Sequence, residues 1–155
     1  MFTRMLKFVR LPLLLLVIFA VGRFSLGLAG VPYAPRGNAM FSVLGLTLVS
    51  SFYFGALSGK VGGFKWSGAL LVGLVIGLFA QILIFSATLV SYLGHFNTYF
   101  IHWDALNVPE GTVVPMSKAI GARAGGLVAG SILGMLAATL GRALGFLAPE
   151  REKVS

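Results

Sequence analysis

The chain has 155 residues, of which 57% are hydrophobic and only 10% are charged, and its mean hydropathy is +0.94. A soluble domain usually has about a quarter of its residues charged, because charged side chains cover the surface that faces water. The composition therefore excludes an ordinary soluble domain, a disordered chain and a coiled coil, and it favours an integral membrane protein.

Four apolar segments follow one another along the chain, and a membrane-spanning helix needs about 20 such residues. The segments cover residues 11–30, 38–59, 66–93 and 119–147. We therefore predict an all-α fold, an integral membrane four-helix bundle that forms a single transmembrane domain over residues 1–155. The rest of the chain is expected to form an outer loop at residues 94–118 and a cytoplasmic tail at residues 148–155.

The first segment has a second interpretation. Arg4, Lys7 and Arg10 precede an uninterrupted apolar run over residues 11–22, and residues 27–29 form a passable cleavage site. This is also the layout of a secretory signal peptide. Since the chain includes the segment, we expect an uncleaved membrane helix.

The net charge of +8 comes from twelve Lys and Arg against four Asp and Glu, and the bases are unevenly placed. With four crossings, one side carries Arg4, Lys7, Arg10, Lys60, Lys65, Arg142, Arg151 and Lys153. The opposite side carries Arg23, Arg36, Lys118 and Arg123. Because cytoplasmic loops are enriched in Lys and Arg, both termini are predicted to be cytoplasmic, in a multi-pass protein of a bacterial inner membrane. Bases placed at segment ends do not indicate a nucleic-acid partner.

The long connection between the last two segments has a helical period in its first part, residues 95–108. Its aromatic side chains fall on one stripe, while Asn97 and Asp104 lie outside it. This pattern predicts a short amphipathic interfacial helix in the third loop. Its interfacial anchors would be Phe96, Tyr99, Phe100 and Trp103. The segment would cap the bundle or, alternatively, serve as a docking surface for another subunit.

Small residues recur in steps of about four along three of the segments. Such faces let helix backbones approach closely in lipid. The predicted helix-packing residues are Gly126, Gly130, Gly134, Gly141, Gly73, Gly77, Ser51 and Gly55. Alternatively, one of these smooth faces meets a partner subunit or a flat pigment or quinone.

Two arginines, Arg23 and Arg123, interrupt apolar runs and share faces with small residues. Long basic side chains near a helix end can reach the lipid headgroups. The only acidic residues on the same side are Asp104 and Glu110, so we predict that the loop folds back and pairs at least one acid with an arginine. A bound phospholipid or a neighbouring subunit's carboxylate is the alternative partner.

No motif for catalysis or for a cofactor stands out. The chain has no cysteine, which excludes disulfides and thiolate-held metals, and the spacing of His95 and His102 does not suit one metal. Gln81 is the only strongly polar group near the middle of a segment. Because a proton pathway commonly has a carboxylate within the membrane, this weakens the interpretation of the chain as a proton relay. We expect no enzyme activity, no metal and no cofactor.

The expected function is therefore that of a non-catalytic small integral membrane subunit, which packs in and stabilises a larger complex of respiratory, photosynthetic or transport type. Its partners would be membrane lipids and other integral membrane subunits, with no soluble substrate. A small transporter or channel acting as an oligomer is the alternative, and it would need a wet path lined by Gln81, Thr88 and an arginine. A membrane enzyme or lipid-binding protein would need polar groups converging in a lateral cleft.

Overall fold

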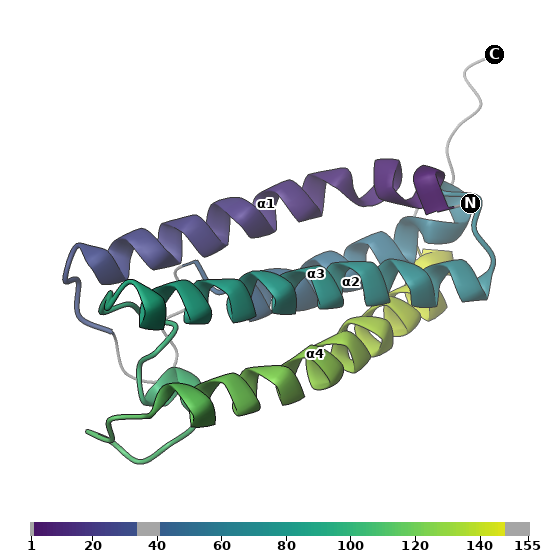
Figure 1. Cartoon of the computed structure of the whole chain (residues 1–155). Coiled ribbons are helices and arrows are strands. Elements are labelled where there is room, and N and C mark those ends of the chain that lie inside the picture. Colours follow the sequence, from purple (N-terminus) through teal and green to yellow (C-terminus); the bar gives the residue numbers. More distant parts are fainter. Residues whose placement is uncertain (1, 34–40, 148–155) are drawn as a thin grey trace.

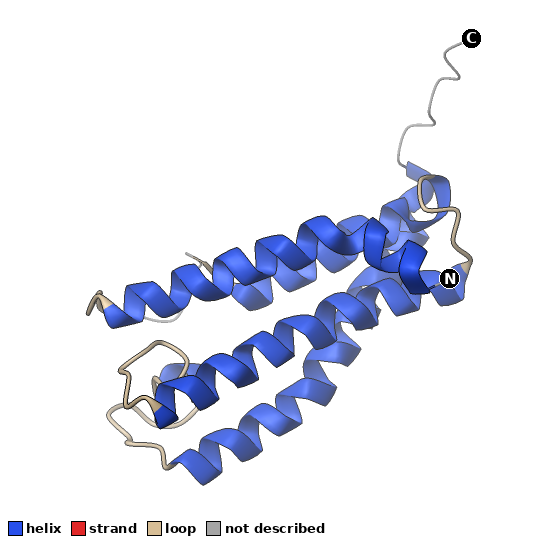
Figure 2. Ribbon diagram, turned by 45° about the horizontal axis from the view of Figure 1, so that its top comes forward, coloured by secondary structure: helices blue, strands red, loops and turns tan. Residues whose placement is uncertain are grey.

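The computed structural model describes residues 2–33 and 41–147. Its four α-helices are α1 (Phe2–Leu28), α2 (Val43–Lys60), α3 (Trp66–Leu93) and α4 (Met116–Leu144). Two short 3-10 turns, η1 (Asp104–Leu106) and η2 (Gly145–Leu147), complete the regular structure, and these described ranges hold no strand. The prediction of an all-helical fold with four helices is confirmed (Figures 1 and 2).

The helices run up and down in one bundle. Helix α1 packs along α3 and α2 on one side, and α4 packs along the same two helices on the other (Figure 1). The start of α1, the α2–α3 connection and the end of α4 meet at one end, which we call the basic end because it carries Arg4, Lys60, Lys65 and Arg142. The opposite end, the loop end, holds the long connection from Gly94 to Pro115.

Three helices are long and apolar enough to cross a membrane by length and composition. These are α1 with 27 residues, α3 with 28 and α4 with 29. Helix α2 has 18 residues and is not one of the three. The structure therefore supports a protein with transmembrane helices.

Several helix boundaries differ from those expected. Helix α1 begins at Phe2 rather than at residue 11, so its three N-terminal bases lie on the helix. Helix α2 begins at Val43, because the Ser42 side chain accepts a hydrogen bond from the backbone N–H of Gly45 at 3.1 Å and caps the helix. Helix α4 begins three residues early, directly after Pro115.

Some expected features fall outside the described residues. They are the first part of the second apolar segment at residues 38–40, the Arg36 turn and the cytoplasmic tail at residues 148–155.

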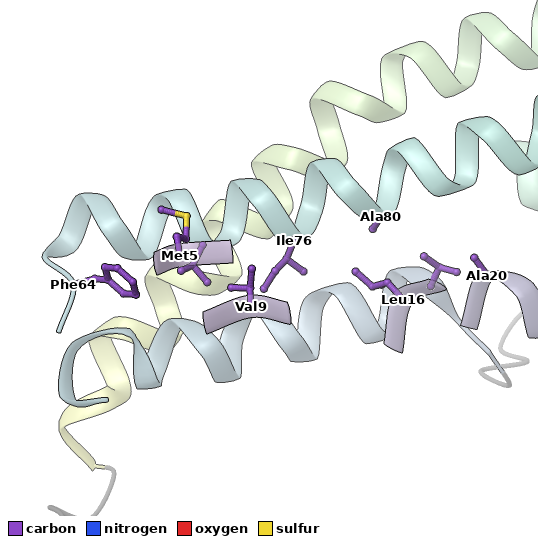
Figure 3. Packing of buried hydrophobic residues seen from close by; sticks show 9 residues of the cluster. Met5, Val9, Leu16, Ala20, Phe64, Ile76 and Ala80 are labelled. Carbon is purple, nitrogen blue, oxygen red and sulfur yellow. The ribbon is translucent and has the colours of Figure 1, made fainter. Parts of the chain in front are cut away.

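The apolar core lies mainly between α1 and α3. Met5, Val9 and Leu16 of α1 are at most 1% exposed, and they form one buried cluster with Phe64 and with Ile76 and Ala80 of α3 (Figure 3). The spacing of these α1 residues follows the helical repeat, so one stripe of α1 is buried while its other side stays exposed.

Helices α3 and α4 touch through glycine. A Cβ atom added at Gly77 would lie 2.7 Å from the carbonyl oxygen of Gly130, and one added at Gly134 would lie 3.1 Å from the Cα atom of Gly77. Gly73 faces the backbone of Gly134 in the same way. The two backbones are therefore in direct contact, with no side chain between them.

Helix α2 meets α4 through the same kind of contact. A Cβ atom added at Gly55 would lie 2.6 Å from the Cα atom of Ala138, and Gly141 faces the backbone of Phe52. Ser51 is fully buried, and its hydroxyl has no hydrogen-bond partner among the described residues. Gly126 lies under the side chain of Gln81 rather than against a backbone.

The predicted interfacial helix in the third loop is wrong except for the single turn η1. Helix α3 ends at Leu93 with Gly94 as its C-cap, and His95, which follows, has φ +53°, which turns the chain out of the helix. The side chains of Tyr99 and Phe100 are 5% and 3% exposed, so the loop buries them against the bundle. These two residues are not headgroup anchors, whereas Phe96 is 41% exposed.

Candidate functional site

A cavity of about 480 Å³ lies at the loop end, bounded by residues of all four helices and of both connections at that end. Two positively charged side chains, Arg23 of α1 and Arg123 of α4, line it together. The cavity volume is within the range of about 300–1,000 Å³ that is usual for small-molecule sites.

Arg123 ties α4 to α3 and to the loop. Its Nε donates to the hydroxyl of Thr88 at 3.2 Å, and its Nη2 donates to the carbonyl oxygen of Phe100 at 2.8 Å. Thr88 is fully buried and donates to the carbonyl of Ile84, so its oxygen is fixed in place for the guanidinium. Thr88 lies on the small-residue side of α3, and this position predicts that it faces a neighbouring helix.

Arg23 is held by tyrosines. Its Nη2 donates to the hydroxyl of Tyr33 at 2.9 Å, and its guanidinium carbon lies 5.3 and 5.5 Å from the ring centres of Tyr33 and Tyr99. Cations are attracted to aromatic faces at such distances. The Tyr99 hydroxyl in turn donates to the carbonyl of Val31 at 2.7 Å, which joins the loop to the end of α1.

The two arginines interact with uncharged groups. The loop folds back onto them as predicted, but it does so through the Phe100 carbonyl and the Tyr99 ring. The hydrogen bonds that the two guanidinium groups donate go to a tyrosine hydroxyl, a threonine hydroxyl and a backbone carbonyl. The expected pairing of a loop acid with an arginine stays a prediction. Glu110 is exposed, and the backbone N–H of Asp104 donates to Nδ1 of His102.

The remaining lining combines polar and apolar side chains. Ser42, Gln81 and Asn107 supply hydroxyl and amide groups, and Leu44 and Ile84 supply apolar surface. Sequence reasoning identified both arginines and Gln81, but it missed the role of Ser42 and of Asn107. For Ser42, its helix-capping position was a local signal in the sequence. No such signal marks Asn107, because its position at the cavity depends on how the two loops close.

His102 lies beside the cavity and is stacked on Tyr33, with ring centres 4.2 Å apart. Burial lowers the pKa of His102, the Asp104 carboxylate opposes this by raising it, and the positive charge of Arg23 lowers it further. The imidazole is therefore neutral at pH 7, and its Nδ1 can accept the Asp104 hydrogen bond. Across the described parts of the chain, His, Asp and Glu form no group of three that could hold a metal ion.

Comparison with known proteins adds no functional assignment. No family model, no curated protein and no solved structure matches the chain. The proposals that follow therefore rest on the residues and contacts described above.

Proposed function

We propose that the chain is a four-crossing membrane protein which acts as a small non-catalytic subunit of a larger membrane complex, of respiratory, photosynthetic or transport type. The positive-inside rule supports a cytoplasmic location for the basic end, because the bases gather there. Both termini are then cytoplasmic, and the long connection from Gly94 to Pro115 lies on the opposite side of a bacterial inner membrane.

Helix α2 is the shortest of the proposed crossings. At about 1.5 Å per residue its 18 residues span roughly 27 Å, close to the hydrocarbon thickness of about 30 Å. Two of its buried hydroxyls are satisfied within the helix, since Thr47 donates to the Val43 carbonyl and Ser58 donates to the Gly55 carbonyl, both at 2.6 Å. Helix α2 can therefore cross between its apolar neighbours without leaving these hydroxyls unpaired.

The observation that carries the subunit proposal is a second small-residue face on α4, opposite the face that packs on α3. It consists of Ser117, Gly121, Gly125 and Ala129, which recur every four residues and are all exposed. Apart from the neighbouring residues and backbone of α4 itself, no heavy atom of the described residues lies within 4 Å of a Cβ atom added at Gly121 or Gly125. Because such faces allow close backbone contact in lipid, this one suits a helix of another subunit.

The test is co-purification in a mild detergent, followed by native mass spectrometry. The wild-type chain should elute with other polypeptides. Gly125→Leu should remain folded but lose them, since the added side chain blocks the backbone approach. Val128→Leu is the matched control, because residue 128 is 64% exposed and already carries a branched side chain.

A wild-type chain that elutes alone, or only with copies of itself, would contradict the subunit proposal. Retention of every partner by Gly125→Leu would contradict the role of this face.

A transporter or channel acting as an oligomer is the second candidate, and the polar cavity that reaches Gln81 is the observation that favours it. Beyond Gln81 toward the basic end, however, the backbone contact of Gly73 and Gly77 with α4 leaves no space between α3 and α4. A path would have to run elsewhere, so the subunit proposal is the better supported of the two.

A further inference from the structure

The two arginines of the cavity bring two positive charges to one site, and their hydrogen bonds described above go to uncharged groups. Arg23 and Arg123 come from helices on opposite sides of the bundle, and both line the same cavity. Their charges are close enough to repel each other. A negatively charged group between them would therefore be attracted by both.

The guanidinium groups also have hydrogen-bond donors to spare. Each guanidinium carries five N–H donors. Arg123 uses two of them on Thr88 and Phe100, and Arg23 uses one on Tyr33. Three of the ten donors are thus used in these contacts. The guanidinium groups can therefore also bind a ligand that has several oxygen acceptors.

The remaining lining narrows the ligand class. Ser42, Asn107 and Gln81 bring hydroxyl and amide groups to the same cavity, and these suit the oxygens of a tetrahedral anion. Ile84 and Leu44 line the apolar part, and Leu44 is 47% exposed on the outer surface of α2. The cavity therefore joins a polar region to an apolar side chain that reaches the outer surface of α2. This combination matches a lipid headgroup with its acyl chain attached.

From these contacts we propose that the cavity is a phosphate-binding site, which takes either the headgroup phosphate of an anionic phospholipid or a free phosphate ion. The two sources share the same chemistry, a phosphate held between Arg23 and Arg123. The lipid form rests on the membrane topology proposed above, whereas neither form depends on a partner subunit.

The experiment is calorimetric titration of the detergent-purified full chain with three probes. Dioctanoyl phosphatidylglycerol carries the phosphate with short acyl chains, dioctanoylglycerol carries the chains alone, and inorganic phosphate carries the anion alone. We expect saturable one-to-one binding of the first probe and none of the second. Inorganic phosphate that binds as tightly as the lipid identifies a free phosphate as the ligand, and lipid binding alone identifies a headgroup.

Variants test the residues. Arg123→Gln and Arg23→Gln should each weaken phosphate binding at least tenfold, since each removes a charge and its free donors. Lys118→Gln is the control, because it removes one exposed charge at the same end of α4 without touching the cavity. It should change the affinity less than twofold.

A second variant keeps the proposal testable if the arginine variants fail to fold. Asn107→Asp puts a negative charge on the cavity wall at an exposed residue with φ +54°, a conformation that aspartate tolerates. It should weaken binding at least tenfold, whereas Asn97→Asp, in the same loop but outside the cavity, should not.

Three results would overturn the proposal: no binding of either phosphate probe, equal binding of dioctanoylglycerol, or unchanged affinity of Asn107→Asp. Because the purified chain is titrated alone, a failed co-purification test leaves this result unaffected.

Discussion

Arg23 and Arg123 show how single side chains shape the loop end. An arginine at the centre of a membrane helix costs about 2.5–3.5 kcal/mol on insertion scales, and less near an interface. Arg123 lies two turns from the start of α4 and is bonded to Thr88 and to a loop carbonyl, so part of its hydration is replaced by fixed oxygens. For Arg23, part of the hydration is replaced by the Tyr33 hydroxyl and by two aromatic faces.

His102 gives the loop end a dependence on pH. The pKa of His102 is lower in the folded chain than the ordinary value of about 6.5, and burial is the main cause. At a pH between these two pKa values, the unfolded chain therefore binds more protons than the folded chain. Stability should therefore fall as the pH drops below about 6.5. Protonation also removes the Nδ1 acceptor of the Asp104 N–H.

Thermal unfolding at pH 7.5 and pH 5.5 measures this effect in detergent. The wild-type midpoint should be lower at pH 5.5, and His102→Gln should reduce the difference. His95→Gln, at an exposed histidine of the same loop, should leave it as in the wild type. An unchanged difference in His102→Gln would show that another group is responsible.

At the scale of the elements, the four helices were predictable because each is encoded locally, by a long apolar run with bases, prolines or a capping serine near its ends. The loop was not. The period of residues 95–108 predicts a helix, but its aromatic residues Tyr99 and Phe100 instead belong to a loop that buries them against the bundle. Likewise, both arginines stand out in sequence, whereas Tyr33 and Asn107 reach the cavity only through the closure of two loops.

Helix α4 offers a direct comparison of its two small-residue faces. Gly134→Leu should prevent stable folding, because the new side chain would meet the backbone of Gly73 and Gly77, and two packed helices cannot separate without losing their contacts. Gly121→Leu should fold normally, since the added atoms meet open space. Thermal unfolding and gel filtration of the two variants check this, and a Gly134→Leu variant as stable as Gly121→Leu would contradict the packing described.

At the scale of the whole molecule, the two ends differ in chemistry. The basic end joins its elements through bases and aromatic rings: Arg4 donates to the Gly62 carbonyl at 2.7 Å and lies 5.4 Å from the ring centre of Phe64, and Arg142 lies 5.8 Å from that of Trp66. The loop end holds the cavity and the tyrosine contacts. The apolar outer surface between them includes exposed Leu11, Leu14 and Ile18 of α1, which suits a lipid environment.

The proposed four-crossing topology is the premise of both the subunit and the lipid proposals, and cysteine labelling in intact cells tests it most directly. The chain has no cysteine of its own, so Val113→Cys in the long loop, at a residue 92% exposed, and Val61→Cys in the α2–α3 connection each introduce one thiol. A membrane-impermeant maleimide should label Val113→Cys from outside, and Val61→Cys only after permeabilisation. Labelling of Val61→Cys from outside with protection of Val113→Cys would contradict the account, because α2 would then not cross or the orientation would be reversed.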